Sequence, residues 1–382
     1  MAARSLATQE ELSLAVDNER KRATVRSLDL SFNELADMYK TGEIRIAPAY
    51  QRLFRWSVAK QSQFIESIIL EMPIPPIYAV EKSESEWELI DGLQRFSTYL
   101  HFTGQLQLPG PDPEVNKNDF LELIACDIVP ALNGMKFADL TTGLKHRVRR
   151  ATLRVEVVRR EGNPRFAYHM FKRLNTGGEP LSNQETRNCS IRLLGTGFVD
   201  FVAKIVADLG FQKCIEDITD EFRSRMGEEE LVLRFFAFKN NMEEYVHDID
   251  PFLTDFLERV TDQTSINALP FNYEQEERIF RKTFKVLATA MGPKACSRWV
   301  DGKYAGGFSM AHYEAFSLGA AAVIDKLPEA PTPTQLDAIS NALTQAKCDP
   351  DLKQLTVGGG KNFKRLYEKK IALVATRLRA VL

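Results

Sequence analysis

The chain has 382 residues, 44% of them hydrophobic and 27% charged, which is enough for two or three domains with separate cores. Its 50 lysines and arginines nearly balance its 52 aspartates and glutamates, which excludes nucleic-acid binding driven by global charge and leaves only a local patch. No apolar run reaches the length of a membrane-spanning helix, and residues 1–22 lack the apolar core of a secretory signal, so we expect a cytoplasmic protein without membrane contact.

The cysteines and histidines give no sign of a metal centre. The five cysteines lie far apart without a CxxC pair, and the five histidines form no HExxH motif. Ordinary reduced thiols, typical of a cytoplasmic protein, explain this distribution better than metal ligation.

Helix and strand patterns alternate in the first half of the chain. Residues 1–28 are polar and charged and predict a helical arm. Ser31 and Glu34 have the spacing of a capping box, and Thr41-Gly42 is typical of a helix end. Strands are expected at residues 43–46, 77–80, 87–90 and 152–158, and further helices at 57–71, 96–102, 164–174 and from Ser182 onward.

Strand patterns fade after about residue 190. Helices are expected at residues 195–209, 228–241, 250–261, 272–291, 309–326, 334–346 and 361–380. The sequence therefore predicts an α+β protein in three parts, which are the helical arm 1–28, an α/β domain over residues 29–190 and an all-helical domain over residues 191–382.

The strongest chemical pattern is a strand that ends at Asp91, followed by Gly92-Leu93-Gln94-Arg95 and a helix. A glycine at such a turn leaves room for a phosphate to approach the backbone, and the first N–H groups of the helix favour an anion. Arg95 offers a fork of donors for phosphate oxygens, and Asp91 is suited to hold Mg²⁺ or to orient a water molecule. Taken alone, such a turn is also a common structural element.

Two further clusters have the character of phosphate-binding loops. Tyr50-Gln51-Arg52 follows a strand and combines an aromatic ring with a cation, which suits a base or a phosphate. Asn175-Thr176-Gly177-Gly178 supplies exposed N–H groups and short polar side chains. The structural alternatives are a core position for the tyrosine with a surface arginine, and a glycine helix end for the second cluster.

The densest basic run extends from Lys145 to Arg150, and its candidate DNA contacts are Lys145, Arg147, Arg149 and Arg150. A second basic cluster lies in the last helix, between Lys361 and Arg379. For either cluster the alternative is a solvated helix face or strand rim.

Taken together, these segments resemble a known family. The run from Gly42-Glu43-Ile44 through Tyr50-Gln51-Arg52, Trp56 and Ile74-Pro75-Pro76-Ile77 to Asp91-Gly92-Leu93-Gln94-Arg95-Phe96-Ser97-Thr98 is similar to the N-terminal domain of the GmrS/GmrD type IV restriction enzymes. The segment from Phe171 to Glu185, which includes Asn175-Thr176-Gly177-Gly178, is similar to the second hallmark of that domain. The same domain occurs in the phosphorothioate-sensing protein SspE, and the resemblance covers about residues 28–190.

The resemblance implies a ParB/sulfiredoxin-like α/β fold and a function in DNA restriction or anti-phage defence. In the family, an Asp-Gly-Gln-Gln-Arg motif binds a nucleoside triphosphate and supports its hydrolysis, coupled to sensing of modified or foreign DNA. Carried over by position, this implies an NTPase that uses Mg²⁺, with Asp91, Gln94 and Arg95 as catalytic residues and Asp91 as metal ligand. The nucleotide-binding residues would be Tyr50, Gln51, Arg52, Gly92, Asn175, Thr176, Gly177 and Gly178.

The chain departs from the family in two places. Leu93 stands where the family has glutamine, and a leucine neither hydrogen-bonds a phosphate nor positions a water, so a non-hydrolysing module that binds DNA or a protein stays an alternative. Family members that cut DNA carry an HNH nuclease with an Asp-His-x-x-Pro core, which none of the five histidines matches. We therefore expect a partner nuclease or effector subunit. A third possibility is a nuclease that uses the α/β site directly. It has the least support, because the sequence shows no cluster of carboxylates that could hold two metal ions.

Overall fold

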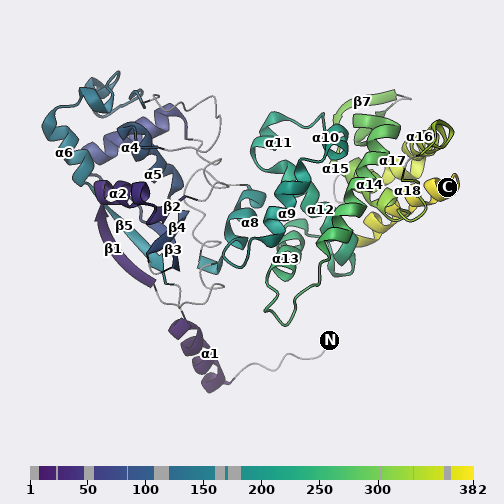
Figure 1. The fold of residues 1–382 in the computed structure, drawn as a ribbon, viewed down its shortest axis with the longest axis horizontal. Coiled ribbons are helices and arrows are strands. Elements are labelled where there is room, and N and C mark those ends of the chain that lie inside the picture. The colour runs from purple at the N-terminus through teal and green to yellow at the C-terminus, as the bar shows by residue number, and fades with distance from the viewer. Residues whose placement is uncertain are drawn as a thin grey trace. The chain divides into compact units, whose positions relative to one another are not determined.

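The computed structural model of the chain describes residues 8–22, 25–46, 56–83, 85–106, 120–159, 168–170, 182–300, 303–329, 331–356 and 363–382. The chain divides into two compact units, residues 1–178 and residues 179–382. The first unit contains a sheet with helices, and the second consists mainly of helices (Figure 1), which confirms the predicted α+β class with a helical second half.

The first unit is built on a five-stranded mixed sheet with the strand order β1-β5-β3-β4-β2. The pairs β1–β5 and β3–β4 are antiparallel, and the pairs β5–β3 and β4–β2 are parallel. The strands are β1 (Val25–Ser31), β2 (Ile44–Arg45), β3 (Ile77–Ser83), β4 (Glu86–Asp91) and β5 (Thr152–Val158). The helices are α1 (Gln9–Arg22), α2 (Phe32–Thr41), α4 (Val58–Ile69), α5 (Leu93–Thr103) and α6 (Thr142–Arg150), with short 3-10 helices η1 (Pro130–Leu132) and η2 (Phe137–Asp139).

Capping residues set several of these helix boundaries as the sequence predicts. The hydroxyl of Ser31 accepts a hydrogen bond from the N–H of Glu34 at 3.1 Å, which begins α2. Gly42 ends that helix with a φ of 83°, in the left-handed region that favours glycine. The hydroxyl of Ser57 accepts from the N–H of Lys60 in the same way at the start of α4.

The helical arm is shorter than the predicted residues 1–28. Helix α1 ends at Arg22, and residues 25–31 form β1, which pairs with β5 along its whole length. Most side chains of β1 are exposed or only half-buried, because the strand lies at the edge of the sheet and has a single neighbour. Leu28 and Leu30 alternate with Ser27, Asp29 and Ser31, which is a short strand pattern that the prediction of a helical arm over residues 1–28 leaves out.

Aromatic side chains join the helices of the first unit. Phe32 of α2 and Tyr99 of α5 are both fully buried, and their rings stack with centroids 4.7 Å apart. Trp56 meets Phe64 of α4 edge-on at 5.6 Å. Helix α4 packs against both α5 and α6 (Figure 1), so it links the three helices.

The second unit contains helices and one short hairpin. Its helices are α8 (Asn183–Ile191), α9 (Gly197–Val206), α10 (Leu209–Cys214), α11 (Asp220–Ser224), α12 (Gly227–Asn241), α13 (Ile249–Thr261), α14 (Tyr273–Met291), α15 (Met310–Ala321), α16 (Pro333–Cys348), α17 (Pro350–Thr356) and α18 (Lys364–Arg379), with 3-10 helices η3 (Met242–Glu244) and η4 (Gly292–Ala295). Strands β6 (Ser297–Val300) and β7 (Lys303–Phe308) form the antiparallel hairpin, which the sequence reading of an all-helical domain did not include.

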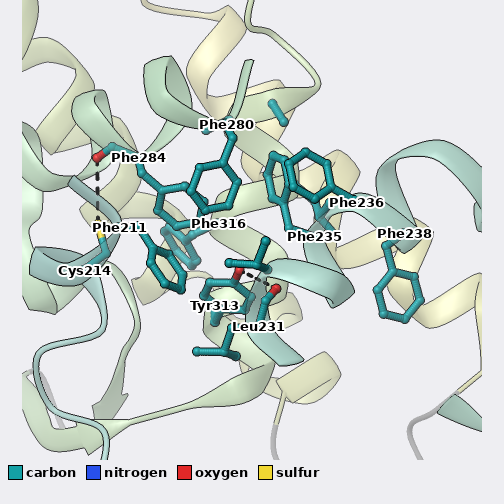
Figure 2. Close-up of a cluster of buried hydrophobic side chains, with 14 of the residues drawn as sticks. Phe211, Cys214, Leu231, Phe235, Phe236, Phe238, Phe280, Phe284, Tyr313 and Phe316 are labelled. Atoms are coloured by element: carbon teal, nitrogen blue, oxygen red, sulfur yellow. Dashed lines mark hydrogen bonds between the residues drawn. The ribbon is translucent and has the colours of Figure 1, made fainter. Parts of the chain in front are cut away.

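Phenylalanine side chains dominate the core of the second unit, as Figure 2 shows. Phe235 and Phe236 of α12 meet Phe280 of α14 with ring centroids 5.2 and 5.6 Å apart. The buried Tyr313 of α15 donates its hydroxyl proton to the carbonyl of Leu231 at 2.8 Å (Figure 2), so its polar atom is satisfied inside the core.

The boundary between the two units lies near residue 178, whereas the sequence predicts a domain boundary at residue 190. Helix α8 accounts for the difference, because it packs against α12 and α13 of the second unit. Among the described residues, no helix is both long and apolar enough to cross a membrane.

Candidate functional site

The site predicted from the sequence lies at the junction of β4 and α5. Gly92 is the N-cap residue of α5 and has a φ of 93°, a left-handed conformation. A Cβ atom at this position would lie 2.1 Å from Cγ2 of Ile77, the first residue of β3. The close approach of α5 to β3 therefore requires the glycine, which is a different reason from the phosphate approach that the sequence indicated.

Asp91 and Arg95 form an ion pair across the first turn of α5. Nη2 of Arg95 lies 3.1 Å from Oδ2 of Asp91 and also donates to the carbonyl oxygen of Pro76 at 3.0 Å. Both side chains are largely buried, with 15% of Arg95 and 29% of Asp91 exposed. Nε of Arg95 is buried and has no hydrogen-bond partner within the described ranges. A buried N–H without a partner is unfavourable, so an acceptor supplied by a ligand would stabilise this arrangement.

Gln94 holds the backbone of Trp56. Its Oε1 accepts a hydrogen bond from the N–H of Trp56 at 3.1 Å, and Nε2 of Gln61 donates to the carbonyl oxygen of Trp56 at 2.7 Å. Oε1 of Gln61 lies 2.9 Å from Nδ1 of the buried His101. These contacts fix the chain four residues after Arg52 against the amino end of α5.

Tyr78 is a residue of this site that the sequence reading missed. It lies opposite Asp91 in the β3–β4 pairing. Burial, together with the carboxylates of Glu156 and Asp91, raises the pKa of Tyr78, so the phenol keeps its proton at neutral pH. The sequence around Tyr78 does not indicate that it lies beside Asp91, because this proximity depends on how β3 and β4 pair.

Leu93, the residue that departs from the family motif, is buried with 9% of its surface exposed. Its side chain belongs to the interior of the first unit, where a leucine in the first turn of α5 is well suited. The position therefore contributes to packing, which explains why an apolar residue is tolerated there.

Asp91 is the predicted metal ligand. Over the residues that the structure describes, no group of three or more His, Cys, Asp or Glu side chains is arranged to hold a metal ion without other ligands. Magnesium commonly uses one or two carboxylates and completes its octahedron with phosphates and water. The carboxylate of Asp91, which contacts Arg95 through Oδ2, fits that limited role.

The other predicted nucleotide-binding residues are not placed. Tyr50-Gln51-Arg52 and Asn175-Thr176-Gly177-Gly178 lie outside the described residues. The chain is described again from Ser182, where a full capping box with Glu185 begins α8. The predicted start of this helix is therefore confirmed, while the loop before it stays a prediction.

The predicted DNA contacts lie on α6, which the sequence reading had not identified as a helix. Lys145, Arg147, Arg149 and Arg150 alternate around a short helix whose only buried residue is Val148. A helix with so few apolar residues has no stripe for sequence reasoning to detect.

Half of the cations in the last helix, α18, are paired within its own unit. Three of its cations are paired with carboxylates, namely Lys364 with Glu243, Lys370 with Glu314 and Arg377 with Asp349. Lys361 lies outside the described residues.

Comparison with known proteins supports the resemblance seen in the sequence. Residues 32–192 match the family model described as the GmrSD restriction endonuclease, N-terminal domain. This part of the chain, which includes the Asp91–Arg95 motif, therefore resembles the N-terminal domain of GmrSD-type restriction enzymes. No match was found among curated proteins or among solved structures.

Proposed function

We propose that this chain is the nucleotide-handling subunit of a DNA restriction or anti-phage system, and that it hydrolyses a nucleoside triphosphate at the amino end of α5. Residues 32–192 resemble the N-terminal domain of a restriction endonuclease family, which supports a role in restriction. In this proposal a partner nuclease or effector subunit cuts the DNA, and the nucleotide state of this chain controls that partner.

The observation that carries the proposal is the buried Nε of Arg95, which has no acceptor among the described residues. It lies in the first turn of a helix whose amino end has no side-chain cap within the described part of the chain. Uncapped N–H groups, the helix dipole and an arginine fork together suit a phosphate. The neighbouring carboxylate of Asp91 is unsuited to bind an anion itself but suited to hold the cation that accompanies a triphosphate.

The residues of the site would then have distinct roles. Arg95 and the N–H groups of α5 bind the phosphates, and Asp91 holds Mg²⁺, which when bound neutralises charge on the phosphate oxygens. Gln94 holds the backbone of Trp56 in place. Tyr78 stays protonated beside Asp91 and is available as a donor. Tyr50-Gln51-Arg52 and Asn175–Gly178 supply further nucleotide contacts in this proposal.

Phosphate release from each of the four nucleoside triphosphates, measured on the full chain with Mg²⁺ and with or without duplex DNA, tests the proposal. Asp91→Asn removes one charge with almost no change of shape and should reduce turnover by at least roughly tenfold. Asp29→Asn is the matched control, because Asp29 forms an exposed pair with Arg154 at 3.0 Å on the far edge of the sheet. Equal turnover in a folded Asp91→Asn variant and the parent would contradict the proposal.

A binding module that hydrolyses nothing is the second candidate. The buried Leu93 favours it, because no amide at this position is available to orient an attacking water. Nucleotide binding by calorimetry, without phosphate release under any condition, would identify this second function. Binding that weakens in Asp91→Asn would still assign the site.

A further inference from the structure

The cations of α6 face two different sides of the helix. Nζ of Lys145 donates to the carbonyl oxygen of Ala138 at 2.6 Å, and the guanidinium of Arg149 lies 5.3 Å from the ring centre of Phe137. The other face of α6 lines a cleft with Gly143, His146, Arg147 and Arg150, the spacing of residues that share one side of a helix. The basic run is therefore divided into two pairs, Lys145 with Arg149 on one side of α6 and Arg147 with Arg150 on the other.

The cleft has a volume of about 600 Å³ and lies between the end of α4 and α6, which are neighbours in the first unit (Figure 1). Its two walls differ in chemistry. Apolar residues form one wall, namely Ile68, Met72, Pro73 and Ile74, and the basic face of α6 forms the other. A Cβ atom on Gly143 would meet nothing within 4 Å, so the cleft is open at that end.

Glu71 is the one carboxylate among the residues that line the cleft. Its Oε1 lies 3.2 Å from Nε of Arg147, and both side chains are exposed, by 69% and 50%. An exposed pair of this kind contributes at most about 1 kcal/mol, so a phosphate can replace the carboxylate. Arg147 also donates to the carbonyl oxygen of Ile69 at 3.4 Å.

Arg150 adds a second cation to the same wall. None of the described residues forms a hydrogen bond or ion pair with its guanidinium, and its side chain is exposed. Arg147 and Arg150 give the cleft two positive charges against the one negative charge of Glu71. The last turn of α6 carries the partial negative charge of a helix end, which favours a cation. This is the structural reason for a basic residue at position 150.

We propose that this cleft binds the sugar–phosphate backbone of duplex DNA, with Arg147 and Arg150 on the phosphates and the apolar wall against deoxyribose. The guanidinium fork matches phosphate oxygens, and both walls are used only by a ligand that carries charge on one edge and carbon on the other. A free phosphate ion would leave the apolar wall without a partner. This inference gives the proposed subunit of a DNA restriction system a surface that contacts DNA, and it therefore rests on the proposed function.

The salt dependence of duplex DNA affinity, measured by fluorescence anisotropy on the full chain without nucleotide, tests the proposal. Each phosphate contact contributes about 0.9 to the slope of log affinity against log salt. The double variant Arg147→Ala/Arg150→Ala should flatten the slope by about 1.8. Lys145→Ala/Arg149→Ala is the matched control, with the same charge removed from the other face of the same helix, and should leave the slope unchanged.

Glu71→Gln supplies an independent variant in case the double variant folds poorly. Removing the competing carboxylate should tighten DNA binding severalfold, since the side chain is exposed and its loss barely affects stability. Equal flattening by the control pair, unchanged slopes in both double variants, or no duplex binding by the parent at low salt would each overturn the proposal. So would displacement of DNA by inorganic phosphate at ionic strengths where chloride has no effect. Because no nucleotide is present, failure of the NTPase proposal leaves these outcomes unaffected.

Discussion

Arg95 shows how one side chain serves both packing and ligand binding. Nη2 joins the end of β4 to the segment before β3, through Asp91 and the carbonyl of Pro76. Nε is left for a ligand. Truncation to alanine would remove both functions at once, which is why the isosteric Asp91→Asn variant is the sharper test of chemistry.

We expect Leu93→Gln to lower the free energy of unfolding by roughly 1–3 kcal/mol, the usual effect of burying an amide without a hydrogen-bond partner. Leu93 has only 9% of its surface exposed, so a glutamine side chain there enters the interior. The substitution restores the family's motif residue, yet packing opposes any gain. Chemical denaturation of the full chain, compared with Leu93→Met as the volume-conserving control, measures the effect.

A different result would revise the role of this position. If Leu93→Gln is as stable as the parent and releases phosphate faster, then the amide reaches the ligand and the leucine is what limits hydrolysis. The same two measurements therefore decide between a packing residue and a lost catalytic residue.

At the scale of elements, the sequence predicts those boundaries that local chemistry determines. Ser31, Ser57 and Ser182 begin helices because their hydroxyl groups accept an N–H three residues on, a pattern visible without any tertiary contact. Helix α6 and the β6–β7 hairpin were missed because neither has a clear apolar periodicity; α6 buries only Val148. Such elements are stabilised by contacts with segments distant in sequence.

In the candidate site, too, the sequence predicts the local features and misses the contacts between distant segments. A strand followed by Asp91-Gly92 and a helix is a local pattern, and the structure has that junction. The contact of Gln94 with Trp56 spans 38 positions, and the position of Tyr78 opposite Asp91 depends on strand register. Contacts of this range have no local signature, so sequence reasoning alone could identify the motif but not what surrounds it.

Glu66 anchors the segment just before η1 to α4, and its removal should loosen that segment. The carboxylate is 2% exposed, and its Oε1 accepts the N–H groups of Ile128 and Val129 at 3.1 and 2.6 Å. Glu66→Ala leaves both N–H groups without an acceptor and should lower the free energy of unfolding by roughly 1–3 kcal/mol. Hydrogen exchange at these two amides should accelerate.

Glu66→Gln provides the control, because its amide oxygen keeps an acceptor in the same place. We expect this variant to retain most of the amide protection. Unchanged exchange rates in Glu66→Ala would mean that the segment is held by its other contacts, such as the hydroxyl of Ser62 on the N–H of Ile124 at 2.9 Å.

On the scale of the whole molecule, the second unit combines an aromatic core with a buried chain of charges. Glu314 of α15 is 2% exposed and contacts Arg234 of α12 at 3.0 Å and Lys370 of α18 at 2.7 Å. Arg187 of α8 joins the same network through Glu230. Each buried charge of this network thus has an opposite charge beside it, which offsets the cost of its burial. This network links the four helices α8, α12, α15 and α18.

Lys347 of α16 departs from that rule and makes the stability of the second unit depend on pH. It is 3% exposed, donates to the carbonyl oxygens of Ala295 and Ser297 at 2.9 and 2.7 Å, and lies over the ring of Phe316. No carboxylate of the described residues pairs with it. Burial therefore lowers the pKa of Lys347 to about 7.

The unfolded chain keeps the lysine proton up to a pH of about 10, whereas the folded chain releases it near 7. Between these values the unfolded state binds more protons, so the free energy of unfolding should rise with pH, by up to about 1.4 kcal/mol per unit. The neighbouring His312, whose pKa burial lowers to about 3, is neutral throughout this range. The buried Cys296 opposes the trend only where unfolded thiols ionise, above a pH of about 8.5. Denaturation curves at pH 7.0 to 8.5 should therefore show a rise that Lys347→Met abolishes, whatever that variant's absolute stability, and an identical slope in both proteins would refute the assignment.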